Sequence, residues 1–158
     1  MGGEPDDFDE FVRATGRRMH HAALLLCGDH HLAEDLTQTA YAKVFAHWSR
    51  VSRMSSPLAY THTVLLRTFL SHRRLRRSSE RPAAELPESA IHGPDASTRL
   101  DVVAALRLLP PRDRAVLVLR YWEDLSVAAT AEVLGIREDA CRRRAARALA
   151  RLRPLIGP

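Results

Sequence analysis

Apolar residues recur at helical spacing along most of the chain, whereas the strict alternation of a half-buried strand is scarce. Leu32, Leu36, Ala40, Val44 and Trp48 follow one another at steps of four, a repeat that places side chains on one side of an α-helix. Ala, Leu and Arg, which favour helices, are abundant throughout. The pattern predicts an all-α fold.

Breaker residues divide this pattern into separate helices. A first helix should stop near Gly28, a second should start near Asp29, and a third should follow Pro57. In the second half, one helix should end at Pro110 and Pro111, and a further helix should follow them. The apolar face of the first helix is predicted to comprise Phe8, Phe11, Val12, Met19, Ala22 and Leu26.

The middle of the chain reads as a linker. Residues 78–97, SSERPAAELPESAIHGPDAS, have almost no apolar periodicity and contain three Pro and one Gly, a composition typical of flexible connections. We therefore expect two small helical domains, residues 1–77 and residues 98–158, joined by this flexible linker. Neither is large enough for a big core, so some apolar surface should be reserved for a partner.

The most informative segment is Leu125–Arg153, LSVAATAEVLGIREDACRRRAARALARLR. A short helix, a Gly turn and an Arg-rich second helix follow one another there. Ala131, Gly135 and Cys141 fall where two crossing helices need a small contact residue, a turn residue without a side chain and a small apolar plug. This is the register of a helix-turn-helix, and it makes DNA the leading candidate partner.

Charge is segregated along the chain in a way that supports nucleic-acid binding. Residues 51–81 hold seven basic residues against one acidic residue, and residues 136–158 hold seven against two, giving net charges of +6 and +5. The first 50 residues, with five basic and eight acidic residues, sum to −3. Two basic blocks, each closing a helical module, indicate two contacts with one polyanion.

Other classes of protein find little support. No run approaches the roughly 18 apolar residues of a membrane span, and the acidic N-terminus MGGEPDDFDEF does not resemble a secretory signal. We therefore expect no membrane association and a cytoplasmic location. Cys27 and Cys141 lie in helical patterns without a CxxC pair, which indicates two reduced thiols that act as small apolar residues.

A metal-dependent hydrolase is the rival from the enzymes. Its ligands would be drawn from His20, His21, His30, His31, Asp29, Glu34 and Asp35. Adjacent histidines on a helix point about 100° apart, however, and no HExxH or Cys/His ligand spacing is present. No phosphate-binding Gly loop or nucleophile elbow occurs either. We expect no catalysis and no cofactor.

Three segments, in order, resemble bacterial RNA polymerase sigma factors of the extracytoplasmic function (ECF) group, and more narrowly the SigE-like factors of actinobacteria. The matching segments are HHLAEDLTQTAYAKVFAHW (His30–Trp48), SPLAYTHTVLLRTFLSHRRLRR (Ser56–Arg77) and LRLLPPRDRAVLVLRYWEDLSVAATAEVLGI (Leu106–Ile136). The resemblance implies a two-domain subunit, with a region 2 helical bundle and a region 4 helix-turn-helix, that binds the polymerase core and directs it to promoters. An anti-sigma protein is a possible further partner.

The resemblance also assigns roles in the first domain. The surface that docks on the clamp helices of the largest polymerase subunit would include Asp35, Leu36, Gln38 and Phe45. Arg67 to Ser71 would turn between two helices and capture an unpaired base of the −10 element, with nearby rings for stacking and cations for phosphates. The residues implied at the −10 element are Tyr60, Arg67, Thr68, Phe69, Ser71, Arg73, Arg74 and Arg77.

In the second domain, the resemblance implies contact with the polymerase flap, and places the helix Asp139–Arg151 in the major groove of double-stranded DNA at the −35 element. The residues implied there are Arg137, Arg142, Arg143, Arg144, Arg147 and Arg151. The chain departs from the family at Thr39, Arg67, His72, Arg137, Cys141 and Arg143. These departures leave open a sigma-like helix-turn-helix regulator that binds DNA but no longer initiates transcription.

Overall fold

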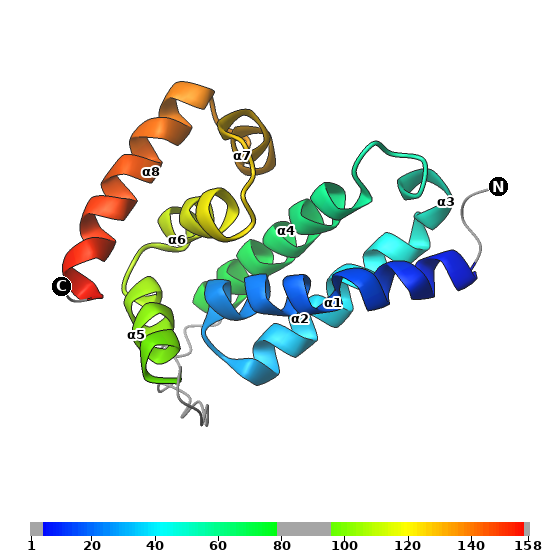
Figure 1. Ribbon diagram of the computed structural model, residues 1–158, viewed down its shortest axis with the longest axis horizontal. Helices are drawn as coiled ribbons and strands as arrows, with labels where there is room; N and C mark the ends of the chain where they lie inside the picture. The colour runs from blue at the N-terminus through cyan, green and yellow to red at the C-terminus, as the bar shows by residue number, and fades with distance from the viewer. Residues whose placement is uncertain (1–4, 79–95, 157–158) are drawn as a thin grey trace. The chain divides into compact units, whose positions relative to one another are not determined.

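The computed structural model describes residues 5–78 and 96–156, and within these ranges every regular element is a helix (Figure 1). The all-α prediction is therefore confirmed. The described chain divides into two compact units, one made of the helices up to Ser78 without residues 24–29, and the other made of residues 24–29 and the helices from Ala96 onward. The expected linker, residues 78–97, lies outside the described residues except at its two ends.

The first unit contains three long helices. The second and the last of these along the chain run side by side, and the first packs aromatic side chains against them. Gly28, with φ +74°, ends the first helix where the sequence predicted a stop, because glycine adopts this left-handed conformation without a Cβ clash. The helices are α1 (Pro5–Cys27), α2 (His30–Ala46), the single-turn α3 (Trp48–Val51) and α4 (Pro57–Ser78). The sequence pattern did not separate α3 from α2.

Helix α4 starts at the predicted proline for a clear local reason. Pro57 occupies the first turn, where its missing N–H is not needed, and the Ser56 hydroxyl accepts a hydrogen bond from the Ala59 N–H at 3.1 Å. The core below it holds the fully buried Val44 and Val51, and Trp48, with Phe8, Phe11, Met54, Tyr60 and Val64 packed around them. Aromatic side chains from three elements thus fix α1 against α2.

The second unit begins with α5 (Ala96–Arg107) and α6 (Pro111–Leu117). Pro110 and Pro111 separate the two helices as predicted. The buried Arg114 guanidinium donates hydrogen bonds to the carbonyls of Leu106 at 2.8 Å and Leu109 at 3.1 Å, which satisfies groups that a helix end leaves unpaired. The remaining elements are the π-helix η1 (Val118–Trp122), α7 (Val127–Leu134), α8 (Glu138–Leu152) and the short 3-10 helix η2 (Arg153–Leu155).

Candidate nucleic-acid interface and docking groove

Helices α7 and α8 form the helix-turn-helix that the sequence predicted. The Ser126 hydroxyl caps α7 by accepting from the Ala129 N–H at 3.0 Å. Gly135 ends the helix in the left-handed conformation, with φ +67°, and the Ile136 N–H then returns to the Ala131 carbonyl at 3.0 Å. Two well-satisfied ends therefore fix the turn between α7 and α8.

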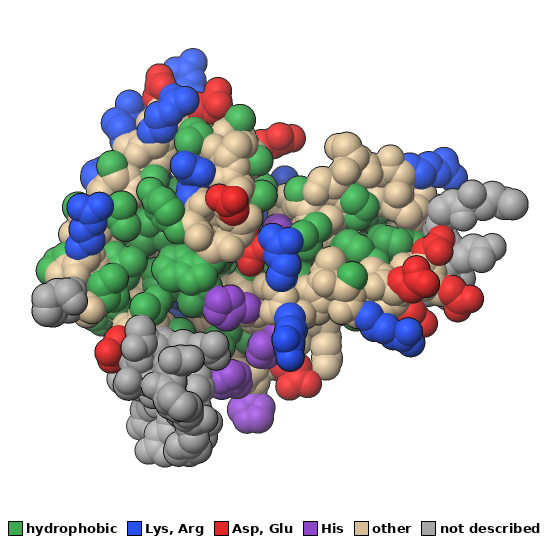
Figure 2. Space-filling view, in the orientation of Figure 1, with side chains coloured by type: hydrophobic (Ala, Val, Ile, Leu, Met, Phe, Trp, Pro, Cys, Tyr) green, Lys and Arg blue, Asp and Glu red, His purple; other side chains and the backbone are tan. Residues whose placement is uncertain are grey.

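One side of α8 is made of small residues and packs on the rest of the second unit. Its buried side chains are Cys141, Ala145, Ala148 and Leu152, which follow at steps of four, three and four and so share one face. Because these side chains are small, α8 approaches α6 and α7 closely. The opposite faces are left to arginines, and Figure 2 shows Lys and Arg side chains along the outer edge of this unit.

The six arginines predicted to meet DNA fall into groups with different surroundings. Arg144 and Arg151 each donate to the carboxylate of Asp113, at 3.0 and 3.1 Å, and Arg142 pairs with Asp139 at 3.3 Å on the exposed surface. Within residues 5–78 and 96–156, no ion pair is recorded for the other three, which are all exposed. These three are Arg137, Arg143 and Arg147.

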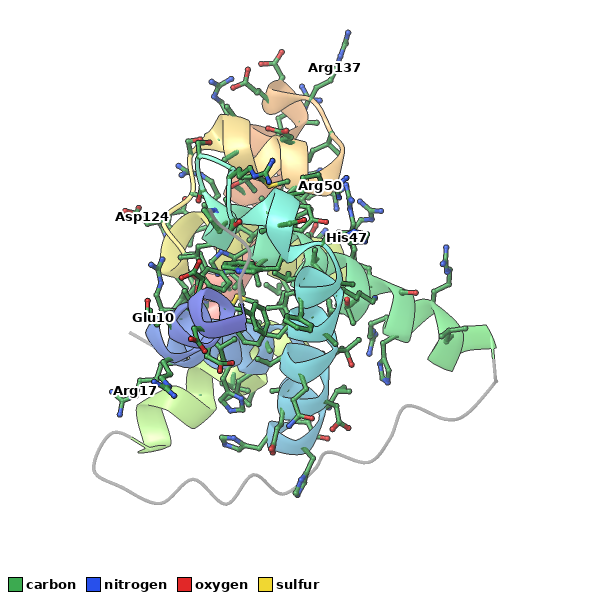
Figure 3. The ribbon with its side chains drawn as sticks, turned by 90° about the vertical axis from the view of Figure 1, so that its right-hand side faces the viewer. Glu10, Arg17, His47, Arg50, Asp124 and Arg137 are labelled. Atoms are coloured by element: carbon green, nitrogen blue, oxygen red, sulfur yellow. The ribbon has the colours of Figure 1, made fainter. Side chains whose placement is uncertain are left out.

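The start of α8 lacks the side-chain cap that serine provides at α7. Arg137 occupies the N-cap position with extended backbone, and its side chain makes no capping hydrogen bond. Figure 3 shows Arg137 extending away from the helices. Glu138 and Asp139 in the first turn compensate in part, since negative side chains are favourable at the positive end of a helix. The departure from the family at Arg137 thus leaves α8 without a side-chain cap.

Helix α4 contradicts the expected turn at Arg67–Ser71. These residues lie in the middle of a continuous 22-residue helix, because the segment has no Gly or Pro and its apolar residues keep helical spacing. Phe69 is fully buried, so its ring packs in the core and is unavailable to stack on a base. Thr68 is also buried, and its hydroxyl donates to the Val64 carbonyl at 2.7 Å. The chain turns instead at residues 52–56.

Four of the residues predicted at the −10 element share one stripe of α4. Tyr60, Arg67, Ser71 and Arg74 follow at steps of seven, four and three, which brings them within about 60° of one another on the helix. Arg67 and Arg74 are exposed, and Tyr60 and Ser71 are half-buried. Arg73 points from another side and is half-buried, while the side chain of Arg77 lies outside the described residues.

On helix α2 the predicted docking residues separate into surface and core. Asp35 and Gln38 are exposed, and Phe45 keeps 50 % of its surface exposed although it is a large apolar residue. Leu36 is only 3 % exposed. Its assignment to the docking surface is therefore wrong, because Leu36 lies on the face of α2 that carries the buried Ala33, Ala40 and Val44.

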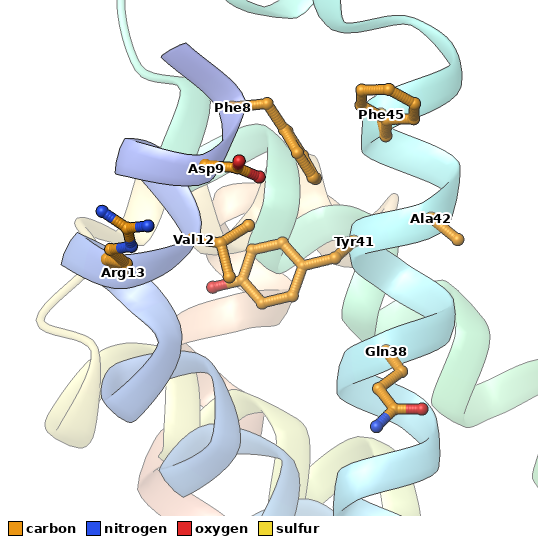
Figure 4. A pocket seen from close by; sticks show the side chains of 8 residues that line it. All are labelled: Phe8, Asp9, Val12, Arg13, Gln38, Tyr41, Ala42 and Phe45. Carbon is orange, nitrogen blue, oxygen red and sulfur yellow. The ribbon is translucent and has the colours of Figure 1, made fainter. Parts of the chain in front are cut away.

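An open groove lies between the N-terminal half of α1 and the C-terminal half of α2 (Figure 4). Its volume is about 610 Å³, and the residues that line it include the predicted docking residues Gln38 and Phe45. The Phe8 and Phe45 rings lie 4.9 Å apart, between centroids. The full lining is Phe8, Asp9, Val12, Arg13, Gln38, Tyr41, Ala42 and Phe45. The sequence pattern placed Phe8 and Val12 on the apolar face of the first helix and did not predict this groove.

Tyr41 forms the floor of the groove and is fixed by a buried contact. Its hydroxyl lies 2.6 Å from the Thr15 hydroxyl, and burial raises the pKa of Tyr41 above its ordinary value. The Thr15 hydroxyl also donates to the Phe11 carbonyl at 2.7 Å. The groove floor is therefore a neutral, hydrogen-bonded phenol, and its charged side chains, Asp9 and Arg13, both come from α1.

The remaining candidate chemistry is modest. Cys27 and Cys141 are free and buried, and burial raises the pKa of the Cys27 thiol to about 11 and that of Cys141 in the same direction, which disfavours the reactive thiolate. The rings of His20 and His30 stack at 5.9 Å. Among the described residues, no group of three His, Cys, Asp or Glu is placed to hold a metal ion, so the hydrolase alternative gains no support.

Comparison with known proteins matches two parts of the chain to two regions of one family. The family model for sigma-70 region 2 matches residues 11–79, and that for sigma-70 region 4 matches residues 99–152. The RNA polymerase sigma-E factor of Streptomyces coelicolor is 35 % identical over 156 residues, covering 96 % of this chain and 86 % of the relative. The ECF RNA polymerase sigma factor SigM of Mycobacterium tuberculosis is 29 % identical, covering 99 % and 81 %.

Solved structures share the fold. The sigma factor RpoE of Bartonella quintana, in complex with the anti-sigma factor NepR, has a TM-score of 0.76 at 23 % identity, covering 95 % of this chain and 96 % of that one. The ECF sigma factor SigJ of M. tuberculosis has a TM-score of 0.66 at 30 % identity, covering 91 % of this chain and 52 % of SigJ.

The helix-turn-helix with its arginine-rich second helix defines a DNA-binding transcription factor. The matches to both sigma-70 regions and the similarity to the S. coelicolor protein make the class specific. The chain belongs to the ECF sigma factors of the sigma-70 family, the subunits that direct RNA polymerase to promoters. Within the described ranges, no helix is long and apolar enough to span a bilayer.

Proposed function

We propose that the chain initiates transcription through three surfaces: a docking face on α2, a −10 face on α4 and a −35 face on α8. Residues 1–77 and 98–158 would be the two working domains. The observation that carries the proposal is the outer side of α8, where exposed arginines lie on the second helix of a well-formed helix-turn-helix. The factor would act in the cytoplasm, where the polymerase and the chromosome are, and the polymerase would perform the chemistry.

The docking face is proposed to comprise Asp35, Gln38 and Phe45. Support comes from their spacing of three and seven residues on one side of α2, and from the half-exposed Phe45 ring beside the open groove. An apolar anchor with a polar rim is the usual composition of a protein interface. The Phe45 ring would enter a pocket on the polymerase, while Asp35 and Gln38 would bond at its edge.

Gel filtration with the RNA polymerase core tests the docking face. The wild-type chain should co-elute with the core, and both Asp35→Arg and Phe45→Ser should lose co-elution while keeping the helical circular dichroism spectrum. Asp101→Arg is the matched control, because it makes the same charge change at an exposed position of α5. A folded wild type that elutes apart from the core would contradict the proposal.

The −10 face is proposed to be the stripe of Tyr60, Arg67, Ser71 and Arg74 on α4, with Arg73 and Arg77 as further phosphate contacts. Support comes from the shared side of the helix and from the exposure of its two arginines, Arg67 and Arg74. A ring for stacking and cations for phosphates are what an unpaired strand requires. In an assay of strand opening at the chain's own promoter, Arg67→Gln should reduce opening, while Arg50→Gln, the same change at an exposed position of α3, should not.

The −35 face is proposed to include Arg137, Arg142, Arg143 and Arg147. Arginine can pair bidentately with guanine in the major groove, and otherwise holds phosphates. Support comes from the exposure of these four residues on α8 and its N-cap. An in vitro selection of promoter sequences should show changed base preference at the −35 element for Arg143→Ser, and unchanged preference at the −10 element.

We also propose that an anti-sigma protein restrains this chain. Support comes from the fold shared with the Bartonella quintana sigma factor, which was solved with its anti-sigma factor NepR. A complex of this chain, purified from its own cells, should contain a second protein whose removal allows binding to the polymerase core. Recovery of the chain as a free, core-binding monomer under all growth conditions would contradict this part of the proposal.

A further inference from the structure

Two of the α8 arginines are bound to a neighbouring helix of the same unit. Asp113 lies in the first turn of α6, and its side chain is only 10 % exposed. One carboxylate oxygen accepts from Arg144 at 3.0 Å, and the other accepts from Arg151 at 3.1 Å. Both oxygens of this largely buried carboxylate therefore accept hydrogen bonds from arginines of α8.

The spacing along α8 explains why Asp113 binds these two arginines and not the others. Arg144 and Arg151 are seven residues apart, about two helical turns, and so lie on the same edge of the helix. Arg147 and Arg143 are rotated by about 60° and about 100° from Arg144, on the side away from the small buried residues. A single carboxylate on α6 can therefore hold the first pair but not the second.

The energetic cost of binding a DNA phosphate differs between the arginines that Asp113 holds and the exposed arginines of α8. If Arg144 turned to a DNA phosphate, Asp113 would retain a poorly hydrated oxygen, because its side chain has little access to water. Arg143 and Arg147 leave no buried carboxylate behind when they bind a phosphate. Exposed arginines are thus available to DNA at lower cost than the two that Asp113 holds.

We propose that Asp113 is a positioning residue that withholds Arg144 and Arg151 from DNA and fixes the rotation of α8 about its axis. Among the predicted −35 arginines, the set that meets DNA is then confined to Arg137, Arg142, Arg143 and Arg147. The inference rests on the proposed role of α8 at the −35 element. It removes two cations from sequence-independent phosphate binding, so a larger share of the contacts is left to bases.

Salt dependence distinguishes an arginine that touches phosphate from one that is merely structural. Each phosphate contact contributes about 0.9 to the slope of log affinity against log salt concentration on duplex DNA. The full chain would be titrated onto a random-sequence duplex of about 30 base pairs, from about 50 to about 200 mM salt. Circular dichroism and thermal melting of each variant would establish that it is folded.

The expected results separate the two groups of arginines. Arg147→Gln should reduce the slope by about 1, while Arg144→Gln and the double variant Arg144→Gln/Arg151→Gln should leave it unchanged. Asp113→Asn frees two guanidinium groups, so it should steepen the slope by about 1 to 2 and tighten binding to random duplex. Asp113→Glu, which restores the carboxylate, should return the slope towards that of the wild type.

The contrary results are equally distinct. If Arg144→Gln reduces the slope as much as Arg147→Gln does, Asp113 does not withhold Arg144, and the inference is wrong while the role of α8 stands. If the wild type shows no salt-dependent binding, the proposed DNA contact of α8 fails and the inference falls with it. The double arginine variant carries the test even if Asp113→Asn does not fold.

Discussion

The two basic helices, α4 and α8, have similar amounts of arginine but bury different kinds of side chain. Helix α8 buries one narrow face of small residues, so its arginines are either exposed or held at the edge by Asp113. Helix α4 carries large residues in the core, including Leu65, Leu66 and Phe69, and among its described arginines Arg67 and Arg74 are exposed whereas Arg73 is half-buried. The difference teaches that neighbouring helices, as much as the basic segment itself, decide which cations can reach DNA.

The comparison has a physical basis in how each helix is packed. Helix α4 lies along α2, and the Lys43 amine donates to the Thr68 hydroxyl at 3.1 Å across that contact. Thr68, which the family resemblance placed at the −10 element, therefore takes part in a hydrogen bond between α2 and α4. In α8 the equivalent constraint is ionic, and it acts on the arginines themselves.

Phe69→Ala gives the largest expected effect and separates core packing from base stacking. Truncating a fully buried phenylalanine should lower the free energy of unfolding by about 3 to 5 kcal/mol. Urea denaturation followed by circular dichroism would measure it. Arg67→Ala, at an exposed position of the same helix, should change stability by less than about 0.5 kcal/mol. A stable Phe69→Ala variant with defective strand opening would restore the base-stacking role.

Asp113→Ala tests the ionic constraint in the second unit. Removing the carboxylate breaks two charge-assisted hydrogen bonds, but Arg144 and Arg151 are 30 % and 57 % exposed and regain water. The expected loss is therefore about 2 kcal/mol, below the cost of breaking a fully buried pair. Thermal unfolding would measure it. The control is Asp139→Ala, whose ion pair with Arg142 is exposed and should be worth less than about 1 kcal/mol.

Thr68→Val probes the bond between α2 and α4 with a smaller expected effect. The substitution keeps the shape of the side chain and removes the hydroxyl that accepts from Lys43 and donates to the Val64 carbonyl. We expect a loss of about 1 kcal/mol in the free energy of unfolding, with binding to duplex DNA unchanged. Thr63→Val, which removes a hydroxyl that donates to the carbonyl of Ala59 within the same helix at 3.1 Å, is the matched control. Weaker DNA binding by Thr68→Val would return Thr68 to the DNA-contacting set.

The sequence predicted the larger features of the fold because they depend on local signals. Gly28, Pro57 and Gly135 end or begin helices where such residues must, and the helix-turn-helix follows from spacing alone. The predicted turn at Arg67–Ser71 was wrong because it came from a family resemblance and had no local breaker residue. The serines of residues 52–56, together with Pro57, were the local signal for the actual turn.

The sequence pattern could not predict contacts between residues that are far apart in the chain. Leu36 and Phe45 are both apolar and nine residues apart on α2, and only the packed helices show that one is core and the other surface. Asp113 gave no signal, because its partners lie 31 and 38 residues away. A carboxylate beside arginines in its own segment, RDR, is more readily interpreted as part of a solvated face.

Arg137→Ser gives the smallest expected change in stability and contrasts the two ends of the helix-turn-helix. Ser126 caps α7 through its hydroxyl, whereas Arg137 begins α8 without a side-chain cap. A serine at 137 should accept from an N–H of the first turn and raise the free energy of unfolding by about 0.5 to 1 kcal/mol. The same change removes an exposed cation, so the slope of DNA affinity against salt should fall by about 1. Ser126→Ala should lose a similar stability with no change in slope. A stabilised variant that binds DNA as the wild type does would remove Arg137 from the interface and leave its position as the loss of a helix cap, which Glu138 and Asp139 offset only in part.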